Sequence, residues 1–119
     1  MTALDRAPHL EPGDRAAWRR WLERNHASAT GVWLVSPRRQ VDRGDIDYGA
    51  AVEEALCFGW IDGQAAGVDH RRLKQYFAPR RPRSQWSKPN EERFRRMLAA
   101  GRVAPAGRAV YERHHAGPS

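Results

Sequence analysis

Three arginines, Arg80, Arg81 and Arg83, lie in a proline-rich stretch that leads into the predicted start of a helix at Ser87. The free N–H groups and the dipole of a helix N-terminus favour an anion. Arginine binds carboxylate or phosphate through two parallel hydrogen bonds. Trp86 adds a flat face on which a ring could stack. This combination predicts a site for an anionic ligand with a planar portion.

The polar side chains of the same stretch extend the predicted site. Ser84 and Asn90 add hydrogen-bonding groups on either side of Trp86, and the prolines stiffen the loop, which lowers the entropy cost of binding. A purely structural interpretation is also open. In it Ser87 caps the helix, Asn90 is its cap partner, Trp86 anchors the core or its rim, and Ser84 holds a turn.

A glycine-bounded turn at residues 59–63 contributes Trp60 and Asp62 to the predicted ligand-binding set. Glycine lets another group approach the backbone closely, so the Asp62 carboxylate could be reached by a ligand. It could accept a hydrogen bond or act as the general base of an enzyme. The structural alternative is an ion pair between Asp62 and Arg80 or Arg81.

The cysteine and the histidines form no recognisable catalytic or metal-binding pattern. Cys57 falls in the last turn of a predicted helix, where the dipole disfavours a thiolate, so we expect a buried and inert thiol. The spacing typical of metal ligands is missing among His26, His70, His114 and His115. We therefore expect neither a metal ion nor a cofactor.

The elements that must position these residues can be predicted from caps, periodicity and turn residues. Helices are expected from Asp14 to about residue 26, from Asp47 to about 58, from Ser87 to Gly101 and from Pro105 to about 115. Strands are expected at residues 30–36, 60–68 and 73–78, the last two antiparallel. This order predicts an α+β fold, a small antiparallel or mixed sheet with about four helices packed on it.

The apolar residues of these helices recur at helical spacing and predict which faces are buried. Glu53 and Glu54 are expected on the solvent side of their helix. The unbroken apolar run at residues 32–35 indicates a strand covered on both faces. Inward faces are predicted for Trp18, Trp21 and Leu22, for Tyr48, Ala51, Val52, Ala55 and Leu56, and for Phe94, Met97 and Leu98.

Length and composition indicate one domain at residues 13–116 after a flexible lead-in at residues 1–12. A hydrophobic fraction of 40% and five tryptophans argue against disorder. The apolar runs are too short to span a bilayer, and the N-terminus does not resemble a signal peptide. A single cysteine is typical of a reducing compartment. We therefore expect a cytoplasmic protein with no membrane partner and leave its oligomeric state open.

The charge of the chain is concentrated in one segment. Residues 71–96 contain ten basic and two acidic side chains, whereas the rest contains eleven basic and twelve acidic ones. Such a segment favours an anionic partner. Nucleic acid is one candidate, with arginines on phosphates and Trp86, Tyr76 or Phe77 stacking on bases. The plainer interpretation is an arginine-rich composition that places arginine at surface positions.

Three strings carry a family resemblance: ALCFGWIDG at 55–63, PRRPRSQWSKPN at 79–90 and GRVAPAG at 101–107. They resemble the YdeI/OmpD-associated family, which carries the label of bacteriocin-protection proteins. The resemblance spans about residues 18–107 and transfers no catalytic residue. It implies a protective role, by sequestering or altering a toxic compound. Val103 and Ala104 stand where the family has Met and Thr, so the last helix lacks a side-chain cap, a loss of about 1 kcal/mol.

The first function predicted from these observations is the binding of a small anionic or planar ligand. The alternative is nucleic-acid binding through the segment from Arg71 to Arg96. A third hypothesis is an enzyme that uses Asp62 as its general base.

Overall fold

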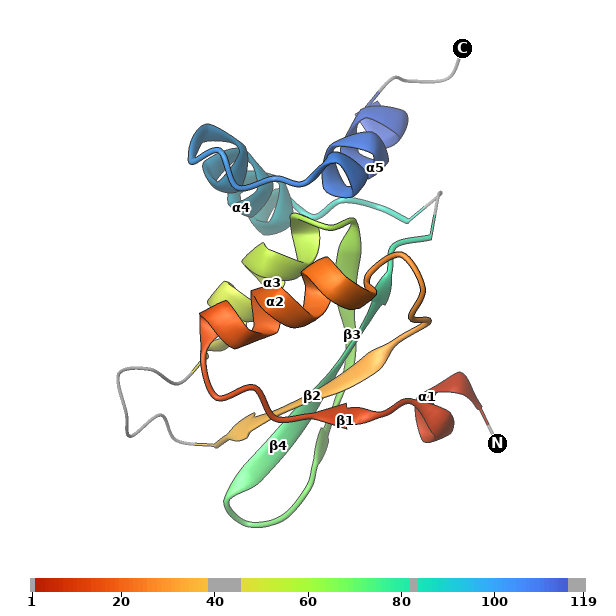
Figure 1. Cartoon of the computed structure of the whole chain (residues 1–119), viewed down its shortest axis with the longest axis vertical. Coiled ribbons are helices and arrows are strands. Elements are labelled where there is room, and N and C mark those ends of the chain that lie inside the picture. The colour runs from red at the N-terminus through yellow and green to blue at the C-terminus, as the bar shows by residue number, and fades with distance from the viewer. Residues whose placement is uncertain (1, 39–45, 82–83, 116–119) are drawn as a thin grey trace.

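The computed structural model describes residues 2–38, 46–81 and 84–115. It confirms the predicted α+β class as a four-stranded mixed sheet with helices packed on it (Figure 1). The strand order is β1-β2-β4-β3; β1 is parallel to β2, and the other neighbours are antiparallel. The strands are β1 (His9–Leu10), β2 (Val32–Pro37), β3 (Trp60–Gly67) and β4 (Arg72–Pro79).

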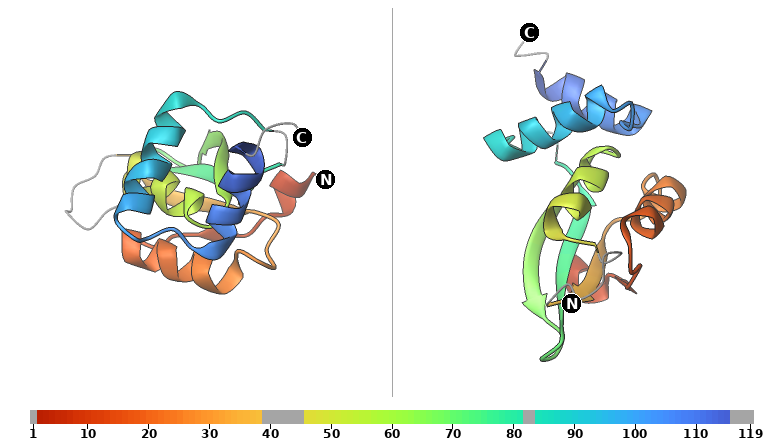
Figure 2. Two further views of the ribbon diagram at one scale, coloured as in Figure 1. Left: turned by 90° about the horizontal axis from the view of Figure 1, so that it is seen from above. Right: turned by 90° about the vertical axis from the view of Figure 1, so that its left-hand side faces the viewer.

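Two pairs of helices have different places relative to the sheet. The pair α2 and α3 packs along the sheet, whereas α4 and α5 lie at the end of the molecule away from the β3–β4 turn (Figures 1 and 2). Within the described residues no helix is long and apolar enough to cross a membrane. The four long helices are α2 (Arg15–Asn25), α3 (Tyr48–Leu56), α4 (Lys88–Ala99) and α5 (Pro105–His115).

The predicted helix starts are confirmed by their caps. Asp14 accepts a hydrogen bond from the backbone N–H of Ala17 at 2.8 Å, and Asp47 accepts one from Ala50 at 2.7 Å. Ser87 likewise caps α4. Each of these side chains satisfies an N–H group that has no partner inside its helix. The positions of these three starts therefore follow from local chemistry.

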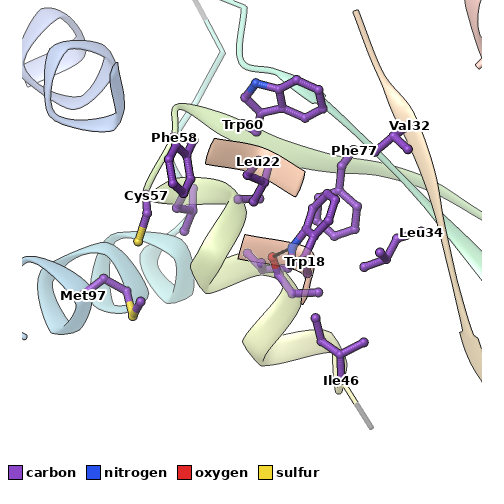
Figure 3. Close-up of a cluster of buried hydrophobic side chains, with 14 of the residues drawn as sticks. Trp18, Leu22, Val32, Leu34, Ile46, Cys57, Phe58, Trp60, Phe77 and Met97 are labelled. Carbon is purple, nitrogen blue, oxygen red and sulfur yellow. Dashed lines mark hydrogen bonds between the residues drawn. The ribbon is translucent and has the colours of Figure 1, made fainter. Parts of the chain in front are cut away.

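The core lies between the sheet and α2, α3 and α4 (Figure 3). Trp18 of α2 packs on Phe77 of β4, with ring centroids 5.2 Å apart, and donates its indole N–H to the carbonyl of Ala51 in α3 at 3.0 Å. Leu22 and Met97 complete this layer from α2 and α4. One buried indole thus joins two helices to the sheet.

The lead-in predicted for residues 1–12 contains two short elements instead. Thr2 and Asp5 form a capping box on the helix α1 (Ala3–Arg6), and β1 follows it. Trp33 of β2 holds this segment, because its indole N–H donates to the carbonyl of Leu4 and its backbone N–H donates to the carbonyl of Pro8, both at 2.8 Å. The N-terminal segment therefore covers Trp33 on the sheet face that α2 and α3 leave free.

The prediction that Glu54 faces solvent is wrong, because its side chain is 0% exposed. Two arginines of α2 reach it: Arg15 donates to Oε2 through Nε, and Arg19 donates to Oε1 at 2.8 Å. Arg102, after α4, lies 3.6 Å from Oε2. A buried carboxylate is tolerated only when it is paired, and here the pairing joins α2 and the α4–α5 connection to α3.

Two apolar side chains expected to face inward are exposed instead. Tyr48 is 53% exposed because it is the first residue of α3 and its hydroxyl reaches out to Asp62. Leu98 is 38% exposed, while Phe94 and Met97 of the same helix are buried. Since α4 lies at one end of the molecule, only a narrow side of it meets the core.

Candidate functional site

A hollow of about 580 Å³ lies on the sheet face turned away from α2 and α3, here called the open face. The alternation of a strand places Tyr76 and Ala78 on this face, since Phe77 between them is in the core. We call this cavity the open-face hollow. It is lined by Thr2, Ala3, Leu4, Thr30, Ile61, Asp62, Gly63, Gln64, Tyr76, Ala78, Pro79, Arg81 and Ser84.

The ring of Tyr76 occupies the middle of this surface because two glycines make room for it. A side chain at Gly31 would overlap the Tyr76 hydroxyl, and a Cβ at Gly63 would lie 3.4 Å from the ring. The ring packs against Trp33 at a centroid distance of 5.3 Å. Its hydroxyl makes no hydrogen bond to any residue that the structure describes. The ring is thus held in place beside the hollow, with a hydroxyl that has no partner among the described residues.

Arg81 is the second residue after β4 and lines the hollow at that end of the strand. The hydroxyl of Ser84 donates to the carbonyl of Arg81 at 2.9 Å, and the backbone N–H of Ser84 donates to the same oxygen at 3.1 Å. These two hydrogen bonds hold the backbone carbonyl of Arg81. Its guanidinium forms no ion pair within residues 2–38, 46–81 and 84–115. Among the lining residues that the structure describes, Arg81 is therefore the one cation available to an anion.

Asp62 borders the hollow at β3, an edge strand of the sheet, but its register partner Phe77 is a core residue, so its side chain points toward the helix face. The predicted ion pair with Arg80 or Arg81 is wrong. The carboxylate instead accepts a hydrogen bond from the hydroxyl of Tyr48 at 2.7 Å. Partial desolvation of the hydroxyl, followed by this hydrogen bond to a carboxylate, raises the pKa of Tyr48 to about 12. The phenol therefore stays protonated at neutral pH and occupies one oxygen of Asp62.

Arg80 and Trp86 form a packed pair and do not line the open-face hollow. Arg80 is only 9% exposed; its guanidinium carbon lies 4.3 Å from the Trp86 ring centroid, and Nη2 donates to the carbonyl of Gln85 at 2.8 Å. The Trp86 ring in turn packs edge-on against Phe94 and Tyr111. Burial lowers the pKa of Arg80, although the charge of Asp62 opposes this shift. The pair anchors the loop on α4 and α5.

The other predicted contacts also have structural roles. Trp60 is 1% exposed and donates its indole N–H to the carbonyl of His26 at 3.3 Å, so its assignment to a ligand is wrong. Ser87 is the N-cap of α4, and Asn90 accepts a hydrogen bond from Arg93 at 3.0 Å. None of these three side chains lines the hollow. Arg83, the remaining predicted arginine, lies outside the described residues.

The structure therefore divides the predicted site. Arg81 and Ser84 line the open-face hollow together with Tyr76 and Thr30, and Asp62 borders it with its carboxylate turned toward Tyr48. Sequence reasoning had not placed Thr30 in a site and had named Tyr76 only for stacking on bases. A signal for them was present: glycines at 31 and 63 leave space beside an aromatic residue of a neighbouring strand. That signal is readable only when the strand register is known.

A second hollow, of about 400 Å³, lies on the other face beside the N-terminus of α3. Its lining includes the core side chains of Leu34, Ala51 and Phe77, together with Arg38 and Tyr48. It contains none of the predicted site residues. We therefore take the open-face hollow as the candidate site.

The cations of residues 71–96 do not form one continuous surface. The first of them lie at the β3–β4 hairpin. Arg72 pairs with Asp69, with Nη2 and Oδ2 3.1 Å apart. Lys74 lies on the open face, with its ammonium nitrogen 4.2 Å from the ring centroid of Trp33. These cations stabilise the turn and the N-terminal segment.

The last cations of the segment belong to α4, at the opposite end of the molecule (Figure 1). Arg95 lies 3.5 Å from a carboxylate oxygen of Glu91, and Arg96 lies 3.1 Å from one of Glu53. The segment thus extends from one end of the molecule to the other, with several of its charges already neutralised by acidic neighbours.

Comparison with known proteins gives a family without an assigned activity. Residues 10–110 match the model of a family described as a domain of unknown function, DUF8412. No curated protein and no solved structure matches the chain. The matched range contains most of the hollow's lining, but not Thr2, Ala3 and Leu4 of its N-terminal wall.

Proposed function

Because the chain belongs to the DUF8412 family, whose description assigns no activity, we propose a function from the site itself: the protein binds a small molecule with an anionic group and a planar portion in the open-face hollow. One observation carries this proposal. Arg81 and Tyr76 line the same hollow, and neither the guanidinium nor the hydroxyl forms an ion pair or hydrogen bond to another described residue.

The size and lining of the hollow suit a small molecule. Ligand sites are commonly concave spaces of about 300–1,000 Å³ with mostly apolar walls and a few placed polar groups. Here Leu4, Ile61 and Ala78 provide apolar wall, while Arg81 provides the charge. An anion at Arg81 would replace water with a charge-assisted hydrogen bond, and a planar body would lie against the Tyr76 ring.

The distribution of charge favours this function over nucleic-acid binding. A groove that follows a phosphate backbone needs cations in a row, and the cations of residues 71–96 lie at opposite ends of the molecule. Asp62 is also a poor general base, because one of its oxygens already accepts a hydrogen bond from the Tyr48 hydroxyl. Sequestration of a toxic compound in the hollow is the protective role compatible with the resemblance to the YdeI/OmpD-associated family.

Amide chemical shifts measured by NMR during titration with benzoate and naphthoate test the proposal. We expect the changes to concentrate at Gly63, Ala78, Arg81 and Ser84. Arg81→Gln should weaken binding by roughly tenfold or more, since it removes the charge that pairs with the carboxylate. Arg95→Gln is the matched control, because it removes the same charge from α4 and should leave the affinity unchanged.

Changes centred on Trp86 and Ser87, or no changes with either compound, would contradict the proposal. Oligonucleotides at low and moderate salt provide the comparison with nucleic-acid binding. Nucleic-acid binding would be favoured by an oligonucleotide affinity that falls steeply with salt. In that case Arg95→Gln should weaken the affinity as much as Arg81→Gln does.

A further inference from the structure

Three residues with polar side chains gather at one end of the open-face hollow, where β2 begins and β4 ends. The antiparallel register of these strands, continued past the start of β2, places Thr30 beside Pro79. The hydroxyl of Tyr76 extends toward the same end, because a Cβ built on Gly31 would lie 2.0 Å from its oxygen. Arg81 is the second residue after Pro79. Thr30, Tyr76 and Arg81 all line the hollow, so it has one polar end.

Two hydroxyl groups at this end are available as hydrogen-bond donors. Thr30 and Tyr76 line the hollow, and their hydroxyls form no hydrogen bond within the part of the chain that the structure describes. Ser84 differs from them, because its hydroxyl donates to the carbonyl of Arg81 at 2.9 Å. A hydroxyl can rotate to donate to an oxygen of a ligand. The polar end therefore offers two hydroxyl donors in addition to the Arg81 guanidinium.

The origin of these donors bears on the shape of the anionic group that they would bind. A guanidinium binds both oxygens of a carboxylate through two parallel hydrogen bonds. Hydrogen bonds to carboxylate oxygens prefer the plane of the group, so a donor outside that plane is poorly placed. Arg81 comes from beyond the end of β4, whereas the hydroxyls come from within β4 and from the start of β2. A tetrahedral oxyanion has a third oxygen outside the plane of the other two, which such hydroxyls can reach.

From these features we infer that the anionic group of the ligand is a tetrahedral oxyanion, with two oxygens on Arg81 and the third at the hydroxyls of Tyr76 and Thr30. This inference rests on the proposed function and specifies the anionic group of its ligand. Sulfonates, sulfate esters and phosphate esters share this chemistry. The planar portion would lie on the apolar wall that Leu4 and Ala78 provide.

Isothermal titration calorimetry with benzenesulfonate and benzoate tests the inference. Both compounds carry one negative charge on the same ring, so a cation elsewhere in the hollow would favour both alike. Tyr76→Phe keeps the ring that packs on Trp33 and removes only the hydroxyl. We expect it to weaken benzenesulfonate binding roughly fivefold, the effect of one hydrogen bond, and benzoate binding less than twofold. Thr30→Val should act in the same direction. Tyr111→Phe, on α5, is the matched control and should change neither affinity.

Equal losses for the two compounds in Tyr76→Phe would overturn the inference, as would an equal loss of benzenesulfonate affinity in Tyr111→Phe. It would also be overturned if the protein bound benzoate but not benzenesulfonate.

Phenyl phosphate separates the possible sources of the tetrahedral group. Tighter binding than that of benzenesulfonate would identify a phosphate ester, and weaker binding a sulfonate or sulfate ester. Either result supports the inference when Tyr76→Phe weakens the tighter ligand. Failure of the proposed function is recognised separately, because neither benzoate nor benzenesulfonate would then shift the amides of Gly63, Ala78 and Arg81.

Discussion

Glu54 owes its burial to arginines from two other parts of the chain. Its two oxygens take hydrogen bonds from Arg15 and Arg19 of α2, and Arg102 lies close to one of them. Periodicity placed this residue on the solvent side because the pattern of α3 alone contains no information about the arginines of a neighbouring helix. The same limit applies to any buried ion pair whose partners are distant in sequence.

Glu54→Gln should lower the free energy of unfolding by about 3 kcal/mol, because it leaves two arginines facing a neutral group in a buried site. Denaturation by urea measures this change. Glu53→Gln is the matched control: the Glu53 side chain is 17% exposed and pairs with Arg15 and Arg96, which themselves reach solvent, so its loss should cost less, roughly 1 kcal/mol. Equal effects of the two substitutions would contradict the structural role of Glu54.

Cys57 is fully buried, as the sequence predicted, and its surroundings make it a weak acid. Burial, together with the charge of Glu54, raises the pKa of the thiol from 9.0 to about 11. The unfolded chain releases this proton near pH 9, whereas the folded chain keeps it until about pH 11. The thiol therefore contributes stability below pH 9 that is lost as the pH rises toward 11.

We expect the free energy of unfolding to fall more steeply between pH 9 and 11 in the wild type than in Cys57→Ala. Urea denaturation of both proteins across this range measures the difference. Every other group that titrates there is present in both proteins, so its contribution cancels in the comparison. Parallel pH profiles for the two proteins would show that the thiol ionises equally well in the folded and unfolded chains.

Among the elements, α5 depends on a close contact between backbones. A side chain at Gly107 would overlap the carbonyl oxygen of Cys57, and the N–H of Ala104 donates to that same oxygen at 2.9 Å. The backbone bond of Ala104 thus anchors the start of α5, where the sequence offers no side-chain cap. The glycine allows the helix to lie directly on the end of α3.

Gly107→Ala should destabilise the protein by about 3 kcal/mol, since neither backbone can move without separating α5 from α3. Gly49→Ala is the matched control in α3. A Cβ there meets only Asp47 at an ordinary distance of 3.5 Å, so the substitution should stabilise the protein by up to about 1 kcal/mol. Thermal unfolding followed by circular dichroism separates the two results; a neutral Gly107→Ala would rule out the close contact.

The main elements were predictable because their signals are local. Asp14, Asp47 and Ser87 cap helices, and the helices α3 and α4 are followed by Gly59 and Gly101 in the left-handed region at φ of 78° and 72°. The segment α1–β1 was not predictable. A two-residue strand has no periodicity, and the position of this segment depends on hydrogen bonds donated by Trp33 of the neighbouring strand β2.

At the scale of the whole molecule, the candidate site combines segments that are far apart in sequence. Sequence reasoning found Arg81, Ser84 and Asp62 because they lie in unusual strings. It grouped them with Trp86 because Arg81 and Ser84 are neighbours of Trp86 along the chain. The fold instead turns Trp86 toward α4 and α5 and brings Leu4 and Tyr76 to Arg81. Only strand order and register contain that information.

Removal of residues 1–7 should therefore weaken benzoate binding by roughly tenfold or more, because it removes the wall formed by Thr2, Ala3 and Leu4. The sheet and the helices α2 to α5 should still unfold cooperatively, since the core contains no side chain from this segment. Calorimetry and thermal unfolding measure the two properties. Unchanged affinity in the truncated protein would exclude the N-terminal segment from the site.

A crystal structure of the protein grown with naphthoate tests the location of the binding site most directly. We expect the ring between Leu4 and Tyr76 on the open face, with both carboxylate oxygens at hydrogen-bonding distance from the Arg81 guanidinium. A ligand bound instead beside Trp86 and Ser87 at the start of α4, with the open face occupied only by water, would contradict the assignment.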